Sequence, residues 1–245
     1  MPRFFIKKDQ IEENSLYIVG DDARHIARSL RMAVGDEITV CDGEGFEYNA
    51  RLSKIRDERC EADVIEKKAS EREPKSKISL FMAYPKSDKL ETVIQKAVEL
   101  GAAEIVPFES SRCIKKPKAD KASEKTARLS RIAEEAAKQC GRAILPSVSL
   151  PLSFSEMIKS AGDCELAIFC YEGSGTTSLK TLLDSFKEPP KTISVVVGCE
   201  GGFSPEEAKA AEEAGFKMAN LGPRILRCET APDYCLAALS YKFEL

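Results

Sequence analysis

Two short and nearly continuous apolar runs, at residues 166–171 and 193–198, constrain the fold of this chain more than any other feature. A strand with one solvated face alternates apolar and polar residues, whereas a continuous apolar run is typical of a strand that is covered on both faces. Such strands belong to parallel sheets with helices on either side. Segments with helical periodicity precede and follow both runs, so the sequence predicts an α/β domain.

The same alternation of strands and helices begins at residue 78. Strands are predicted at residues 78–83, 104–108 and 216–221, and helices within 90–100 and 121–140. Ser153 and Glu156 have the spacing of a capping box, which predicts a further short helix from residue 153.

Residues 1–70 read differently, as a small β-barrel. Alternating segments flank residues 42–45, Asp-Gly-Glu-Gly, which are a hairpin signal. One short helix is expected at 22–31, where Ile26 and Leu30 share a face. Residues 67–77 are charged and contain a proline, which is typical of a linker. The expected domains are therefore residues 1–73 and 74–245.

Composition excludes several classes of protein. No apolar run approaches the roughly 20 residues that span a bilayer, and the early charges at the N-terminus do not fit a signal peptide, so we expect a cytoplasmic protein. The nine cysteines are scattered without a C-x-x-C pair, and His25 is the single histidine. A zinc site or a disulfide framework is therefore not expected, and any catalysis is expected to proceed without a metal.

Positive charge is concentrated between residues 112 and 142. This segment contains ten Lys and Arg residues and four acidic residues, whereas the whole chain has a net charge of −3. Such a segment suits a polyanion such as nucleic acid, and it also suits an ordinary solvated helix surface. The segment contains Lys115, Lys116 and Lys118, and both interpretations stay open.

The first chemical motif is residues 198–207, Gly-Cys-Glu-Gly-Gly-Phe-Ser-Pro-Glu-Glu. Ser204, Pro205 and Glu207 have the arrangement of a helix N-terminus, so the three glycines lie between a buried strand and a helix. Ligands of open α/β sheets bind at this end of the strands, and the missing Cβ atoms leave backbone groups free to contact a ligand. A tight turn alone would need fewer glycines.

Two nucleotide fingerprints are absent from this loop. The spacing is neither that of a P-loop nor G-x-G-x-x-G, and Glu200 and Glu206 would repel a pyrophosphate. The motif therefore favours a ligand with cationic or hydrogen-bond-donating groups.

The second motif is residues 221–232, Leu-Gly-Pro-Arg-Ile-Leu-Arg-Cys-Glu-Thr-Ala-Pro, between the last strand and the last helix. Thr230 with Asp233 is expected to cap that helix. Two arginines and a glutamate between apolar residues indicate a functional loop, and the alternative is a salt-bridged surface turn.

At these two motifs the chain resembles the SPOUT class of methyltransferases, and more narrowly the bacterial family that methylates uridine N3 in small-subunit ribosomal RNA. The resemblance spans nearly the whole chain. Its matching stretches are Arg3-Phe4-Phe5, residues 25–36, 94–101, 139–142, 198–203 and 221–231. One departure is Cys199, which stands where the family usually has proline.

The resemblance implies a C-terminal α/β domain with a trefoil knot, preceded by a PUA-like β-barrel that binds RNA. It also implies a homodimer, S-adenosyl-L-methionine as cofactor, and small-subunit (16S) ribosomal RNA or the assembled subunit as substrate. The implied cofactor residues are Gly198, Glu200, Gly201, Gly202, Leu221, Gly222, Ile225 and Leu226. The candidate RNA-binding residues are Arg3, Arg31, Lys115, Lys116, Lys118, Arg142 and Arg224.

Methylation of an imide nitrogen requires loss of its proton and stabilisation of negative charge on the uracil. Arg227 is the predicted stabilising cation. Glu229 is a candidate base, and the alternatives are that it caps a helix or that it pairs with an arginine and so orients Arg227. His25 lies in the barrel and is expected to be structural or to contact RNA. The alternatives are a knotted methyltransferase acting on transfer RNA or ribose 2′-OH, and a non-catalytic RNA-binding protein of ribosome assembly.

Overall fold

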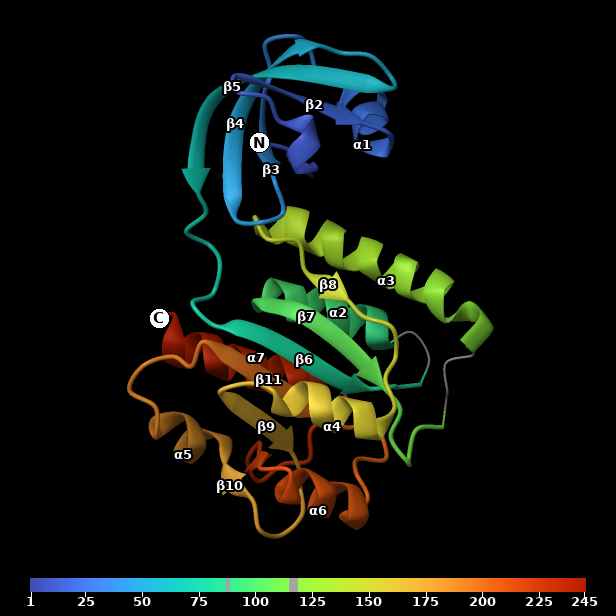
Figure 1. Ribbon diagram of the computed structural model, residues 1–245, viewed down its shortest axis with the longest axis vertical. Coiled ribbons are helices and arrows are strands. Elements are labelled where there is room, and N and C mark those ends of the chain that lie inside the picture. The colour runs from blue at the N-terminus through green and yellow to red at the C-terminus, as the bar shows by residue number, and fades with distance from the viewer. Residues whose placement is uncertain (87–88, 115–118) are drawn as a thin grey trace. The chain divides into compact units, whose positions relative to one another are not determined.

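The computed structural model describes residues 1–86, 89–114 and 119–245 and divides the chain into two compact units (Figure 1). Unit 1 comprises Met1–Glu73 and Ala137–Leu145, and unit 2 comprises Pro74–Ala136 and Pro146–Leu245. The predicted boundary places residues 137–145 in the second domain, whereas the structure groups this segment with unit 1.

Unit 1, which the structure describes throughout, is built on one curled five-stranded sheet (Figure 1). Its strands in spatial order are β1 (Arg3–Phe5), β3 (Glu37–Cys41), β4 (Phe46–Lys54), β5 (Arg59–Ala69) and β2 (Ser15–Val19). β1 is parallel to β3 and the other pairs are antiparallel. A 3₁₀ turn, η1 (Lys8–Gln10), joins β1 to β2.

The predicted hairpin turn joins β3 to β4. The Asp42 carboxylate accepts hydrogen bonds from the backbone N–H groups of Glu44 (2.9 Å) and Phe46 (3.1 Å), so the aspartate side chain closes the turn. Gly43 and Gly45 have φ values of 78° and 112°, which explains the two glycines.

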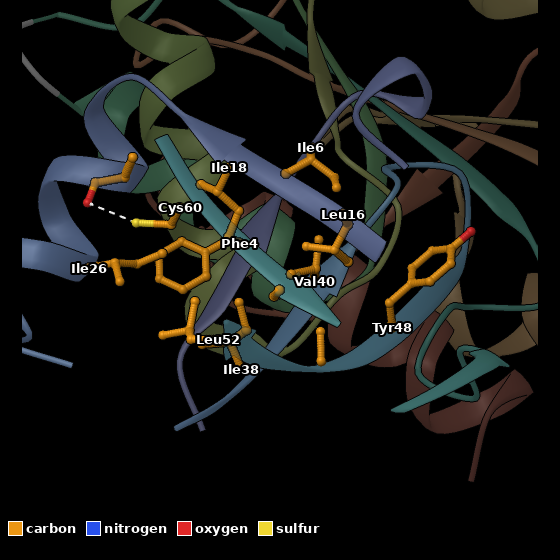
Figure 2. Packing of buried hydrophobic residues seen from close by; sticks show 13 residues of the cluster. Phe4, Ile6, Leu16, Ile18, Ile26, Ile38, Val40, Tyr48, Leu52 and Cys60 are labelled. Atoms are coloured by element: carbon orange, nitrogen blue, oxygen red, sulfur yellow. Dashed lines mark hydrogen bonds between the residues drawn. The ribbon is translucent and has the colours of Figure 1, made fainter. Parts of the chain in front are cut away.

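The alternating residues of these strands meet in one core (Figure 2). Phe4, Ile18, Val40 and Leu52 are each at most 2% exposed, and the Cys60 thiol lies 3.8 Å from the carbonyl oxygen of Ala23. This core explains why residues 1–70 alternate in sequence.

The helix predicted at 22–31 is shorter and irregular. α1 (Asp21–Arg24) continues into a π-helical turn, η2 (His25–Ser29), and Arg31 has a left-handed backbone with φ 51°. The wider π turn separates Ile26, which is fully buried, from Leu30, which is 39% exposed. The prediction that these two residues share a face is therefore wrong.

The segment predicted as a linker contains part of the structure of unit 1. β5 extends to Ala69, and the carboxylate of Glu73 accepts hydrogen bonds from Arg142 Nε (3.1 Å) and Arg142 Nη2 (2.8 Å). The same carboxylate accepts the N–H groups of Ala143 (2.8 Å) and Ile144 (3.0 Å). These bonds hold residues 142–144 against unit 1, which is why this segment does not follow the predicted boundary.

In the described part of unit 2, seven strands form a parallel sheet. The spatial order is β10 (Thr177–Ser178), β12 (Lys217–Asn220), β9 (Leu166–Cys170), β11 (Thr192–Val197), β6 (Lys77–Ala83), β7 (Ala102–Phe108) and β8 (Ser147–Val148). β9 and β11 are the two apolar runs, and both lie inside the sheet with a neighbour on each side. The α/β prediction is confirmed.

Helices cover both faces of this sheet (Figure 1). α2 (Lys89–Glu99) and α7 (Thr230–Phe243) lie on one face, and α4 (Phe154–Gly162) lies on the other. The remaining helices are α3 (Ala119–Cys140), α5 (Leu179–Asp184) and α6 (Pro205–Glu213). No helix in the described ranges is long and apolar enough to cross a bilayer.

The predicted capping boxes of α4 and α6 are confirmed. The predicted cap of α7 is wrong, because Glu229 occupies the N-cap position and makes no side-chain capping bond. The N–H groups of Thr230 and Ala231 instead donate to the backbone oxygen of Arg227. Asp233 Oδ1 is buried without a hydrogen-bond partner among the described atoms, and this burial raises the pKa of the Asp233 carboxyl.

Candidate cofactor-binding site

The order of the strands brings three loops to one edge of the unit 2 sheet. After β9 the chain forms β10 at the far edge and then returns to insert β11 between β9 and β6. β12 then pairs with the other side of β9. The carboxyl ends of β9, β11 and β12 therefore meet where the strand order reverses, which is the usual ligand position in open α/β sheets.

A pocket of about 780 Å³ lies at this edge. The predicted cofactor residues that line it are Gly198, Glu200, Gly201, Gly202, Leu221, Gly222, Ile225 and Leu226. Arg224 and Arg227 line it as well. Lys89 and Arg112 are further lining residues that the sequence analysis did not assign to the site, whereas Glu229 is not among the lining residues described.

The glycine loop, residues 198–203, is held in a tight turn. The Gly202 N–H donates to the Cys199 oxygen (2.9 Å), and the Gly202 φ of 62° is one that residues with a Cβ rarely adopt. A Cβ on Gly198 would lie 3.1 Å from Gly202 Cα. Phe203 then enters the core, where its ring lies 4.2 Å from that of Phe169 between centroids.

Residues 110–113, which follow β7, pack beside the glycine loop. The Ser111 N–H donates to the Glu207 carboxylate (2.7 Å), and Arg112 Nη1 donates to the Gly201 oxygen (2.9 Å). The Ser110 hydroxyl lies 4.0 Å from the Cys199 sulfur. In the sequence, the start of the basic segment at Arg112 is the feature that could have indicated these contacts with the glycine loop.

The arginine loop, residues 221–229, forms the opposite part of the pocket lining. Arg224 and Arg227 are exposed, and Ile225 is 82% exposed, so the side chains at the centre of the loop project away from the protein core. The Arg227 backbone is fixed because its oxygen accepts the first N–H groups of α7. The Arg227 guanidinium is thus an exposed cation on a held backbone.

Glu229 is paired with Lys89 rather than with Arg227. Lys89 Nζ lies 3.0 Å from Glu229 Oε2 and 3.2 Å from Glu200 Oε1. The Cys228 thiol also donates to Glu229 Oε2 (3.2 Å). In the part of the chain that the structure describes, no ion pair joins Glu229 to Arg227, so the predicted Arg227–Glu229 pair is wrong.

Lys89 contributes to lowering the pKa of both carboxyl groups beside it. Burial alone would raise the pKa of Glu229, but the hydrogen bond from Lys89 and its own backbone N–H outweigh burial and lower this pKa. The pKa of Glu200 is lowered in the same way against burial, by backbone N–H groups that include that of Lys86, and by Lys89. A carboxylate with a lowered pKa is a weak proton acceptor, which argues against Glu229 as the general base.

The predicted RNA-binding residues lie in different places. Arg3 and Arg142 are held inside unit 1: Arg142 is 4% exposed and paired with Glu73, and Arg3 pairs with Glu47 at 3.1 Å. Arg142 is buried and Arg3 is half-buried, and each pairs with a carboxylate of unit 1, so neither is an exposed charge for a phosphate. Arg31 and Arg224 are exposed. Lys115, Lys116 and Lys118, which are also predicted to bind RNA, lie outside the described residues.

Comparison with known proteins identifies the chain. A family model described as an RNA methyltransferase domain matches residues 71–240, and a model described as an RNA methyltransferase PUA domain matches residues 18–65. Ribosomal RNA small subunit methyltransferase E of Bacillus subtilis (strain 168) is 37% identical over 100% of this chain and 98% of its own length. The chain belongs to the ribosomal RNA small subunit methyltransferase E family.

Solved structures agree with this membership. The ribosomal RNA small subunit methyltransferase E of Neisseria gonorrhoeae, solved bound to S-adenosyl methionine, is 30% identical with a TM-score of 0.87 and covers 99% of this chain and 98% of its own. A methyltransferase of Legionella pneumophila, solved with bound SAM, is 28% identical with a TM-score of 0.86 over 98% and 96% of the two chains. The resemblance to the family and the predicted fold class, apart from the knot, are confirmed. The trefoil knot stays a prediction.

Proposed function

We propose that this chain methylates N3 of a uridine in small-subunit ribosomal RNA and that S-adenosylmethionine is the methyl donor. The observation that carries this proposal is the pocket at the ends of β9, β11 and β12, which the glycine loop and the arginine loop line together. Membership of the methyltransferase E family supports the reaction, and the relatives solved with S-adenosylmethionine support the cofactor.

The residues of the pocket fit this cofactor. A Cβ on Gly202 would meet no atom within 4 Å, so this position opens onto free space and a ligand can approach the backbone. The pKa of Glu200 is lowered by backbone N–H groups and Lys89, and its carboxylate suits a cationic ligand. When bound, S-adenosylmethionine supplies an electrophilic methyl group on a positively charged sulfur. Gly198, Gly201 and Gly202 would hold it on one side, and Leu221, Gly222, Ile225 and Leu226 on the other.

Arg227 is the residue assigned to the chemistry. The uridine loses its N3 proton as the methyl group arrives, and negative charge develops on the uracil oxygens. The Arg227 guanidinium lines the pocket and is exposed, so it is free to donate to those oxygens. Its held backbone limits the reorganisation that this donation requires. Arg224, on the same loop, would bind a phosphate of the RNA.

RNA recognition and dimerisation complete the proposal. Unit 1 contains the segment that matches the PUA model, and its exposed Arg31 would contact RNA together with the basic segment. An RNA substrate of the ribosome places the reaction in the cytoplasm. Tyr234 and Tyr241 of α7 are 48% and 76% exposed and lie seven residues apart on one helix face. This aromatic face would bind a second copy of the chain.

The proposal is tested by nucleoside analysis and by single-turnover kinetics. Small-subunit RNA from a deletion strain should lack one 3-methyluridine, and complementation should restore it. Loss of a transfer RNA or 2′-O-methyl modification would instead assign another substrate, and an unchanged set of nucleosides would indicate a non-catalytic RNA-binding protein.

Arg227→Ala should lower the methyl-transfer rate by about 10²-fold or more at saturating RNA and cofactor, since this is the usual cost of losing one donor to a developing oxyanion. Arg227→Lys should recover part of the rate because it keeps the charge but not the planar fork. Lys209→Ala is the control, because it removes an exposed charge on α6 that does not line the pocket. A wild-type rate for Arg227→Ala would remove Arg227 from the chemistry.

A further inference from the structure

Lys89 contacts two loops that are separate segments of the chain. It is the first residue of α2, and its ammonium contacts Glu200 of the glycine loop (3.2 Å) and Glu229 at the end of the arginine loop (3.0 Å). The sequence separates Lys89 from these partners by more than a hundred residues. One cation therefore joins the two loops that line the pocket.

The two carboxylates need this cation. Both lie within 3.2 Å of the same nitrogen, so they are close to each other and repel when both are ionised. Glu200 is further held by the Lys86 N–H at 3.1 and 3.3 Å, and Glu229 by the Cys228 thiol at 3.2 Å. The Lys86 N–H contacts one carboxylate and the Cys228 thiol contacts the other, whereas the Lys89 ammonium contacts both.

We propose that Lys89 is a positioning residue that sets the distance between the glycine loop and the arginine loop and thereby forms the cofactor site. This inference rests on the proposed function, because it takes S-adenosylmethionine as the ligand of the pocket. Without the ammonium the carboxylates separate, and the loops that carry them move apart. The pocket then has to be reassembled at the expense of binding free energy.

If Lys89 acted only through its charge, the opposite result would be expected, so one experiment distinguishes the two explanations. Lys89 lines the pocket, so removing its positive charge would favour a cationic ligand if the residue were only a nearby charge. S-adenosylmethionine carries the sulfonium cation, and its demethylated product, S-adenosylhomocysteine, lacks it. A positioning role weakens both ligands by the same factor, whereas a charge effect separates them.

The experiment is calorimetric titration of Lys89→Met with both ligands. We expect the Kd of each to rise about 5-fold or more, within the usual range of coupling between linked elements. Lys89→Arg should restore most of the affinity, since a guanidinium can also join two carboxylates. Glu229→Gln should weaken both ligands less than Lys89→Met, and the double variant Lys89→Met/Glu229→Gln should be no weaker than Lys89→Met alone.

Lys96→Met is the matched control, because Lys96 lies on the same helix and its ammonium pairs with Glu99 at 2.9 Å. Neither residue is among the described residues that line the pocket. The Lys96→Met variant should bind both ligands as the wild type does. Unchanged affinity of Lys89→Met for both ligands, or tighter binding of S-adenosylmethionine alone, would overturn the inference. If Lys89→Met does not fold, equal weakening of both ligands by Glu229→Gln supports the inference and unequal weakening overturns it. A wild-type protein that binds neither ligand would refute the proposed function instead.

Discussion

Gly198→Ala tests the glycine loop with the smallest possible change. The Gly198 backbone is not in the left-handed region, so alanine fits its conformation, and the effect comes from contacts alone. The new methyl group would lie 3.1 Å from Gly202 Cα, 3.2 Å from Gly202 C and 3.2 Å from Phe203 Cε2. Two of these three atoms belong to the backbone of the loop, so rotation of a side chain cannot relieve the strain.

The magnitude follows from the cost of overpacking a tight site, which is about 1–3 kcal/mol. The loop relieves this strain by widening its turn, so that Gly202 and Phe203 move away from residue 198, and cofactor binding must reverse that movement. The Kd for S-adenosylmethionine should therefore rise about 5- to 150-fold. Any strain that the loop does not relieve lowers the melting temperature, by about 2–4 °C for each kcal/mol in a chain of this size.

Titration calorimetry and thermal melting of the same samples measure both effects. Gly162→Ala is the matched control, since its methyl group would lie 3.6 Å from Phe216 Cε2, an ordinary contact at the end of α4. It should bind and melt like the wild type. A Gly198→Ala variant with wild-type Kd and wild-type melting temperature would refute the view that the loop needs the close approach of Gly202 to Gly198.

Two further predictions concern unit 1. Glu73→Gln removes the carboxylate charge that pairs with the buried Arg142 guanidinium and should lower the free energy of unfolding by about 3–5 kcal/mol in urea titrations, whereas Glu37→Gln, which breaks an exposed pair, should cost at most about 1 kcal/mol. Burial would raise the pKa of Glu47, but hydrogen bonds from Arg3 and Ser70 outweigh burial and lower this pKa. The stability that the Glu47 carboxylate contributes is therefore present above its unfolded pKa of 4.5 and is lost as pH falls through the lower folded pKa. Unfolding at pH 7, 5, 4 and 3 should show a flatter acid decline for Glu47→Gln, and an equally steep decline would contradict the assignment.

Local patterns were sufficient to predict most of the elements of unit 2. Ser204 and Glu207 of the capping box are three positions apart, and the first turn of the helix brings them together in space. β9 and β11 were predictable because burial on both faces leaves few polar positions in each run, Ser194 being the one in the run that forms β11. The cap of α7 could not be predicted in this way, because the helix begins at Thr230 itself and the backbone oxygen of Arg227 accepts its first N–H groups.

Charged residues were harder to interpret than apolar ones. Arg142 and Glu73 are 69 residues apart, and each lies in a stretch that is highly charged in sequence, so neither showed that it is buried. Arg3 and Arg142 were therefore predicted to contact RNA, although both stabilise unit 1. Lys89 and Glu229 are separated by 140 residues, and only the insertion of β11 beside β6 brings their segments together. An ion pair of this kind is a property of the topology.

Under the proposed reaction, the negative charge of Glu200 and the positive charges of Arg224 and Arg227 have different functions. They also differ in how the structure holds them. Glu200 is held by the Lys86 N–H and by Lys89, so the negative charge is fixed beside the glycine loop. Arg224 and Arg227 are exposed on the arginine loop. A methyl donor is cationic and remains in its site during the reaction, which suits a fixed carboxylate. An RNA substrate enters from solvent as an anion and develops further negative charge on the uracil, which suits exposed arginines on a loop whose ends are held. The pairing of Glu229 with Lys89 instead of Arg227 is therefore favourable for this reaction, because it leaves the arginine free for the RNA.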